Sequence, residues 1–130
     1  MVKRIFKTDK APLPKGPYSQ AVISQGLLFI SGQGPIDPKT GKAIKGTIEE
    51  ETKATLENIK AIIEEAGASL TDTLKTTCFL SSMDDFSRFN DIYKQYFHSE
   101  PRSRTTVQAA RLPFDFKVEI DAIVSLKNKT

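Results

Sequence analysis

Apolar residues in the first third of the chain fall in short runs separated by turn-forming residues, a pattern typical of strands. Residues 21–23 and 27–30 are two such runs, and the Ser-Gln-Gly between them predicts a hairpin. Asp-Pro-Lys-Thr-Gly at 37–41 is a strong turn signal that should lead into a short strand near Ala43 and Ile44. The pattern therefore predicts three strands before the first helix.

Two later segments carry helical spacing instead. The first starts with a capping-box pattern, Thr47 and Glu50, and ends at Gly67, since glycine is favoured after a helix C-terminus. The second starts near Met83. Its aromatic residues form a stripe at helical spacing: Phe86, Phe89, Tyr93, Tyr96 and Phe97. We assign this stripe to the core rather than to a base-stacking platform, because no basic groove is evident beside it.

Three further strands are predicted at about residues 73–80, 104–110 and 116–125. The connection between the last two contains Pro113 and should be a loop. The resulting order is β-β-β-α-β-α-β-β. Two helices packed on one mostly antiparallel mixed sheet make a two-layer α+β sandwich.

Alternation along the last strand separates its two faces. Five apolar residues share the face that must meet the helices: Phe116, Val118, Ile120, Ala122 and Val124. Glu119, Asp121 and Ile123 share the other face, and Arg104 on the preceding strand matches it, so Arg104 and Glu119 should share a face if these strands pair. Periodicity alone favours a solvated face with a weak exposed ion pair. Ile123 is apolar and fits a solvent-exposed face poorly, which indicates that another subunit covers part of this face.

The composition narrows the classes of function without selecting one. The 130 residues fit one domain spanning 1–130, and a formal net charge of +3, with both signs interspersed, disfavours nucleic-acid binding. A single cysteine, Cys78, excludes an intramolecular disulfide and favours a reducing, cytoplasmic setting. With His98 as the one histidine, no metal-ligand cluster is expected. Neither a signal peptide nor a membrane span is predicted.

Several short motifs, in order along the chain, resemble one family. They are Gly-Pro-Tyr-Ser-Gln at 16–20, Ser-Gly-Gln at 31–33, the turn at 37–41, Asn-Ile-Lys-Ala-Ile at 58–62, Arg104, Ala-Arg-Leu-Pro at 110–113 and Val-Glu-Ile at 118–120. Together they resemble the reactive intermediate deaminases, the RidA or YjgF-like family. The resemblance extends from about residue 5 to residue 125, and it rests on the order and spacing of the motifs.

The resemblance implies a chorismate-mutase-like fold and a homotrimer whose outer sheet faces pack around the three-fold axis, with active sites between subunits. It also implies hydrolysis of enamine and imine acids, such as 2-aminoacrylate, to 2-keto acids and ammonia without a cofactor. The alternative is a binding or regulatory trimer that holds 2-keto acids without turnover. The scattered charge disfavours a third activity described for relatives, that of a ribonuclease or translation inhibitor.

The two central roles implied by the resemblance belong to Arg104 and Glu119. The planar guanidinium of Arg104 would bind the substrate carboxylate through two N–H groups; the alternative is a structural ion pair with Glu119 or Asp121. Glu119 would hold the attacking water or carry a proton to the leaving nitrogen; the alternative is an ion pair with Lys117 or with an arginine at the subunit interface. Asp121 lies on the same strand face, so only the alignment selects Glu119.

The other implied positions are substrate-binding ones: Tyr18, Ser31, Gly32, Asn90 and Thr106. The alternative for Ser31 is a strand-end hydroxyl bonded to the backbone, for Tyr18 a plug at the subunit interface, and for Asn90 a solvent-facing helix position. Thr106 stands where many relatives carry cysteine, so thiol chemistry is not available there. Cys78 is interpreted as an inert core residue.

Overall fold

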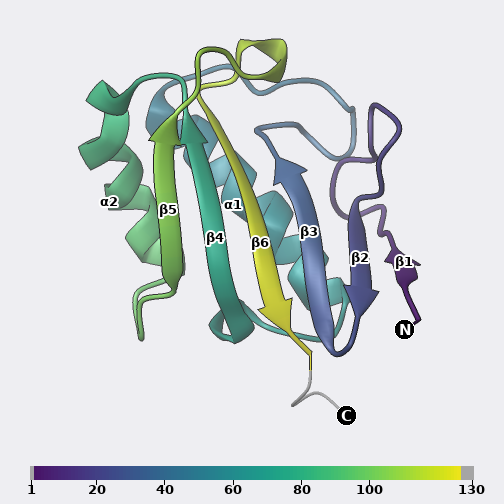
Figure 1. Cartoon of the computed structure of the whole chain (residues 1–130). Coiled ribbons are helices and arrows are strands. Elements are labelled where there is room, and N and C mark those ends of the chain that lie inside the picture. Colours follow the sequence, from purple (N-terminus) through teal and green to yellow (C-terminus); the bar gives the residue numbers. More distant parts are fainter. Residues whose placement is uncertain (1, 127–130) are drawn as a thin grey trace.

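The strands form one mixed sheet, and both α-helices cover the same face of it (Figure 1). In the computed structural model, which describes residues 2–126, the sheet order is β1-β2-β3-β6-β4-β5. The strands are β1 (Arg4–Phe6), β2 (Ala21–Ser24), β3 (Leu27–Gln33), β4 (Thr73–Leu80), β5 (Ser103–Gln108) and β6 (Val118–Ser125). The helices are α1 (Ile48–Glu65) and α2 (Phe86–Tyr96), with short 3-10 turns η1 (Leu70–Asp72), η2 (Met83–Asp85) and η3 (Pro113–Asp115). The predicted two-layer α+β sandwich and its element order are confirmed.

Local sequence signals determine where both helices begin. The Thr47 side chain accepts the N–H of Glu50 at 3.1 Å, and the Glu50 carboxylate accepts the N–H of Thr47 at 2.9 Å. This is the predicted capping box. Helix α2 follows the turn η2, where the Ser82 hydroxyl accepts the N–H of Asp84 at 3.1 Å. Among residues 2–126, no helix is long and apolar enough to cross a membrane.

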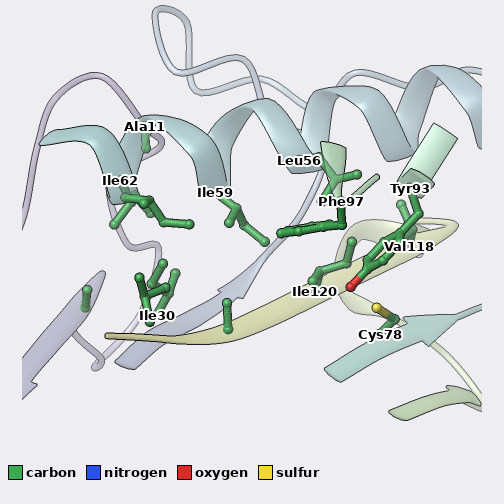
Figure 2. Packing of buried hydrophobic residues seen from close by; sticks show 14 of the residues in the cluster. Ala11, Ile30, Leu56, Ile59, Ile62, Cys78, Tyr93, Phe97, Val118 and Ile120 are labelled. Atoms are coloured by element: carbon green, nitrogen blue, oxygen red, sulfur yellow. The ribbon is translucent and has the colours of Figure 1, made fainter. Parts of the chain in front are cut away.

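The hydrophobic core lies between the helices and the inner face of the sheet (Figure 2). Leu56 and Ile59 of α1 are fully buried, as are Val118 and Ile120 of β6. Each buried aliphatic side chain of this size stabilises the fold by about 1.5–3 kcal/mol. Along β6 the residues alternate between buried and half-buried, which confirms the predicted inner face and leaves Glu119 on the open face.

The early strands differ from the prediction in the residues that form them. The expected strand near Ala43 and Ile44 is reduced to a single bridge between Ile36 and Ala43. Prolines at 35 and 38 interrupt this segment and prevent a longer ladder. The additional strand is β1, which pairs antiparallel with β2 at the edge of the sheet. It is only three residues long, so its sequence carries no usable alternation.

The main correction concerns the last two strands, which do not pair with each other. β4 lies between them, antiparallel to β6 and parallel to β5. Arg104 is in register with Thr76, which is completely buried under the helices, whereas Glu119 is in register with Phe79 on the opposite face. The prediction that Arg104 and Glu119 share a face is therefore wrong. β5 is an edge strand with no fully buried residue, so neither of its alternating sets is apolar enough to mark the inner face.

Candidate functional site

The residues implied by the resemblance fall into two groups on opposite sides of the sheet. On the open face, one depression, which we call the Glu119 pocket, is lined by Tyr18, Ser31, Gly32, Pro113 and Glu119. On the helix side, a second depression, which we call the Arg104 pocket, is lined by Asn90, Tyr93, Lys94, Phe97, Pro101, Arg102 and Arg104. Thr106 lines neither of them. A single chain therefore presents the other residues in two separate depressions.

Glu119 lies half-buried on β6, close to the end of β3. A Cβ atom built on Gly32 would lie 2.5 Å from Oε2 of Glu119, so only glycine permits this approach. Burial and, secondarily, the neighbouring Asp121 carboxylate raise the pKa of Glu119 above its ordinary value. Asp121 itself is hydrogen-bonded to Thr77, whereas the Glu119 carboxylate has no hydrogen-bond partner within residues 2–126. A carboxyl group in this state is suited to accept and release a proton.

Ser31 and Tyr18 form the rim of the Glu119 pocket. The Ser31 hydroxyl donates to the backbone carbonyl of Ser19 at 2.6 Å, as the backbone-bonded alternative required. Its oxygen remains available only as an acceptor. Tyr18 is 51% exposed, and its hydroxyl accepts the N–H of Lys15 at 3.4 Å. Tyr18 thus offers an aromatic surface at the pocket edge.

Arg104 is held by α2 rather than by a carboxylate. Its guanidinium carbon lies 4.7 Å from the ring centroid of Tyr93, 5.6 Å from that of Phe86 and 5.7 Å from that of Phe89. One terminal nitrogen donates to Oδ1 of Asn90 at 2.8 Å. In the described part of the chain, no Asp or Glu forms an ion pair with Arg104, so the structural ion pair considered above is not formed. Its remaining N–H groups, unpaired within that range, are suited to an anionic ligand.

Asn90 and the aromatic residues of α2 act together on Arg104. Phe86, Phe89, Asn90 and Tyr93 recur at intervals of three and four residues and therefore share one helix face. The aromatic stripe was assigned to the core alone, and its contact with Arg104 was missed. Tyr93 belongs to the core and also contacts Arg104. Its hydroxyl bonds to that of Thr76 at 2.6 Å in the buried layer. The signal was present in the sequence: a polar Asn90 inside an otherwise aromatic stripe.

Thr106 and Cys78 lie side by side in register on the helix side of the sheet. The Thr106 hydroxyl oxygen is buried. Burial raises the pKa of the Cys78 thiol to about 11, so the thiol stays protonated at neutral pH and is a poor nucleophile. Elsewhere in residues 2–126, no three His, Cys, Asp or Glu side chains come together so that they could hold a metal ion.

Comparison with known proteins agrees with the motifs and the fold. The family model described as Endoribonuclease L-PSP matches residues 8–126. The chain belongs to this family, that of the YjgF and RidA proteins. The resemblance drawn from the short motifs is confirmed.

Relatives within the family carry different names. A RutC family protein from Pyrococcus abyssi is 49% identical over 95% of this chain and 97% of its own length. A 2-iminobutanoate/2-iminopropanoate deaminase from Capra hircus is 46% identical over 95% of this chain and 90% of its own. A Lactococcus lactis relative, 42% identical over 96% of this chain and 99% of its own, is named only as a candidate regulator. E. coli TdcF, solved with bound serine, shares the fold with a TM-score of 0.89 and 40% identity, over 94% of this chain and 98% of TdcF.

Proposed function

We propose that the protein hydrolyses reactive 2-imino acids and their enamine forms, of the 2-aminoacrylate type, to 2-keto acids and ammonia. The observation that carries this proposal is the state of Arg104, a guanidinium caged by aromatic rings with no carboxylate partner in the described chain. A substrate carboxylate suits it because the planar guanidinium can donate two parallel hydrogen bonds. The deaminase name of a relative at 46% identity supports the reaction class.

The reaction consumes one water and releases one ammonia, with no change of oxidation state. The enamine first tautomerises to the imine, and Arg104 holds the carboxylate next to the imine carbon. Water attacks that carbon and gives a proton to Glu119, which then delivers a proton to the nitrogen. The resulting carbinolamine then gives its hydroxyl proton to Glu119, which passes it to the amino nitrogen; the C–N bond breaks, ammonia leaves and the carbonyl of the 2-keto acid forms. The raised pKa of Glu119 brings its proton affinity closer to that needed for both transfers.

A site that uses both residues requires two copies of the chain. Arg104 and Glu119 lie on opposite faces of the sheet, and a three-carbon acid is too short to contact both through it. We therefore include in the proposal a homotrimer in which Arg104 of one subunit approaches Glu119 of the next. Exposed apolar side chains on the open face support such a contact: Phe29 is 41% exposed and Val107 is 43% exposed.

The test is an assay in which a serine dehydratase generates 2-aminoacrylate and pyruvate release is followed. We expect the protein to shorten the lag between dehydration and pyruvate release in proportion to its concentration. Arg104→Ala protein at the same concentration serves as the control and should leave the lag unchanged. Pyruvate release that is independent of the wild-type protein would contradict the proposal.

The alternative is a trimer that binds 2-keto acids and regulates a partner without turnover. The Lactococcus lactis relative named as a candidate regulator supports it. Because the same pocket residues serve both functions, turnover discriminates between them. Pyruvate binding measured by calorimetry, together with an unchanged lag in the dehydratase assay, would select the regulatory alternative.

A further inference from the structure

The turn η3, which precedes β6, has an unusual backbone. Phe114 and Asp115 are consecutive non-glycine residues with φ of 57° each, in the left-handed region. Residues other than glycine, asparagine and aspartate rarely adopt this backbone conformation, and it is least expected for a bulky residue such as phenylalanine. Such strain persists only where the surroundings impose it, and it concentrates at functional sites.

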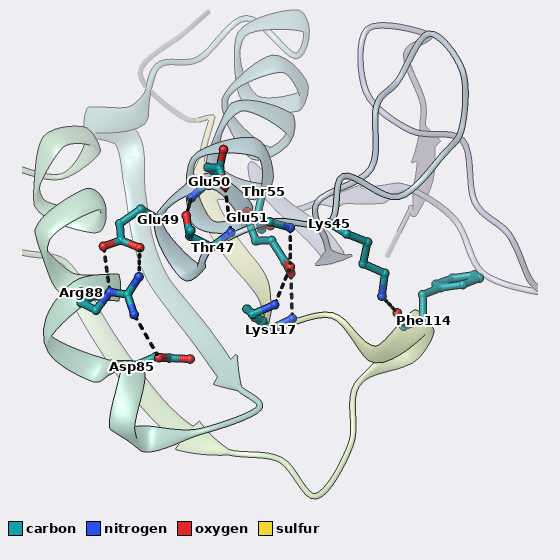
Figure 3. Close-up of polar contacts among 11 residues, drawn as sticks. Lys45, Thr47, Glu49, Glu50, Glu51, Thr55, Asp85, Arg88, Phe114 and Lys117 are labelled. Carbon is teal, nitrogen blue, oxygen red and sulfur yellow. Dashed lines mark hydrogen bonds and ion pairs between the residues drawn. The ribbon is translucent and has the colours of Figure 1, made fainter.

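Several contacts hold this turn in place. The Lys45 ammonium donates to the backbone carbonyl of Phe114, as Figure 3 shows. Arg111 and Asp115 form an ion pair at 2.8 Å. The rings of Phe114 and Phe116 lie 5.4 Å apart between centroids. These contacts restrain the backbone of the turn, and the Phe114 ring packs against that of Phe116 although 57% of the residue is exposed.

The next residues along the chain tie the turn to α1. The carboxylate of Glu51, which is completely buried, accepts the backbone N–H of Lys117 at 2.8 Å and lies 3.4 Å from its ammonium (Figure 3). Two residues later the chain reaches Glu119. The strained turn and the carboxylate are thus parts of one anchored segment.

The Phe114 ring contributes to the wall of a cavity of about 70 Å³. Its lining is mixed, and the apolar part comes from Pro12, Leu13, Tyr18, Pro113, Phe114 and Phe116. Lys15, Gln20 and Gln33 add polar groups. Glu119 and Gly32 line the same cavity, so it adjoins the Glu119 pocket. The apolar wall of this cavity, beside the proton-transferring carboxylate, is a natural place for the side chain of a substrate.

We propose that this cavity is the side-chain subsite, and that it selects 2-imino acids with a branched aliphatic side chain over the methyl-bearing imine formed from 2-aminoacrylate. This inference rests on the proposed function and names its substrate class. The cavity is several times larger than the space one water needs, but only about half of a cavity of about 150 Å³ that admits benzene. By that comparison the three-carbon isopropyl end of a leucine-derived side chain fits, whereas a six-carbon ring does not.

The test compares two imines made by an L-amino-acid oxidase, one from alanine and one from leucine, with semicarbazide trapping the imine that escapes hydrolysis. We expect kcat/KM to be at least tenfold higher for the leucine-derived imine, since one added carbon in an apolar pocket already contributes about tenfold discrimination. Phe114→Gly and Phe114→Asn remove the ring and suit the left-handed backbone, so both should fold. Both should lower the leucine-to-alanine ratio by about tenfold. Leu74→Ala, which removes a 50% exposed apolar side chain elsewhere, should leave the ratio unchanged.

Binding of pyruvate and of 4-methyl-2-oxopentanoate by calorimetry separates the two proposals. Loss of the preference for the branched acid in the Phe114 variants, without any turnover by the wild type, would refute the deaminase function and keep the subsite. Turnover of both imines with a ratio that Phe114→Gly and Phe114→Asn leave unchanged would refute the subsite alone. Size-exclusion chromatography should give the same assembly for all variants. If the Phe114 variants dissociate, the ring belongs to a subunit contact and the subsite assignment is wrong.

Discussion

Two inactive variants, Arg104→Ala and Glu119→Gln, should restore activity to one another when their chains are assembled together. The reason is the strand order: β4 places Arg104 on the helix side of the sheet and Glu119 on the open face. If each active site takes its arginine from one subunit and its glutamate from the next, a mixed assembly contains some sites in which both residues are intact.

The single variants should each be strongly impaired. Arg104→Ala removes two charge-assisted hydrogen bonds to the substrate carboxylate, each worth about 1.5–3 kcal/mol, which lowers kcat/KM roughly 10²- to 10⁴-fold. Glu119→Gln keeps the shape of the side chain but removes proton transfer, which costs roughly 10²- to 10⁴-fold in rate. Glu119→Gln should keep the wild-type melting temperature, because the Glu119 carboxylate has no partner within residues 2–126. Arg104→Ala should melt somewhat lower, since it loses the hydrogen bond to Asn90 and the contacts with the aromatic rings of α2, but it should keep the wild-type assembly.

If the Arg104→Ala and Glu119→Gln chains are mixed in equal amounts and assemble at random, the fraction of activity that is recovered can be calculated. A site is intact only if one subunit supplies the native arginine and its neighbour the native glutamate, so about one quarter of the sites recover. The assay is the pyruvate-release assay on protein that has been unfolded and refolded as a mixture. Native mass spectrometry of chains with distinct tags verifies that they mix.

Arg88→Ala provides the matched control, since Arg88 lies on α2 but pairs with Glu49 away from both pockets. Mixed with Glu119→Gln, it should recover about one half of the sites, because only the glutamate has to be supplied. Verified mixed assemblies of Arg104→Ala and Glu119→Gln with no more activity than the separate variants would refute the shared site.

Three further predictions concern the surroundings of Glu119. Gly32→Ala should lower kcat more than it changes stability, since a Cβ there would lie 2.5 Å from the carboxylate oxygen and displace it; steady-state kinetics and thermal melts check this. Because the Asp121 charge raises the pKa of Glu119, Asp121→Asn should lower that pKa and move the acidic limb of the kcat/KM profile to lower pH; an unmoved limb would contradict the role of Glu119 as the base. Glu51→Ala leaves the buried N–H of Lys117 without its acceptor and should destabilise the fold by about 1–3 kcal/mol in urea unfolding, whereas Glu51→Gln should restore part of the loss.

The sequence predicted the positions of the strands and helices better than it predicted which strands pair with one another. β6 is central, with one face against the helices, so its alternation of Val118 and Ile120 with Glu119 identified the inner face correctly. β5 is an edge strand in which Arg104 points inward and Val107 points outward, so its pattern favoured the wrong face. The strand–helix–strand order from β4 through α2 to β5 was the better guide, since a helix between two strands is typical of a parallel pair.

The site residues were found by resemblance, but their arrangement depends on contacts that no pattern along the chain encodes. Asn90 was expected to bind substrate, and the structure shows that its side chain accepts a hydrogen bond from Arg104. Ser31 was expected in the pocket and lines it, although its proton is bound to the backbone. No pattern in the sequence singles out Phe114, because its importance comes from a left-handed backbone conformation that is visible only in the folded structure.

Each half of the proposed site is organised within its own chain before any subunit contact forms. Asn90 and three aromatic rings orient Arg104, while Gly32 and the segment anchored by Glu51 position Glu119. Assembly therefore only has to bring two prepared surfaces together, and little binding energy is spent on reorganisation. It follows that a dissociated chain should still bind a 2-keto acid weakly through Arg104 but should not hydrolyse an imine. Activity per chain would then fall on dilution more steeply than keto-acid binding does, which a site built within one chain would not show.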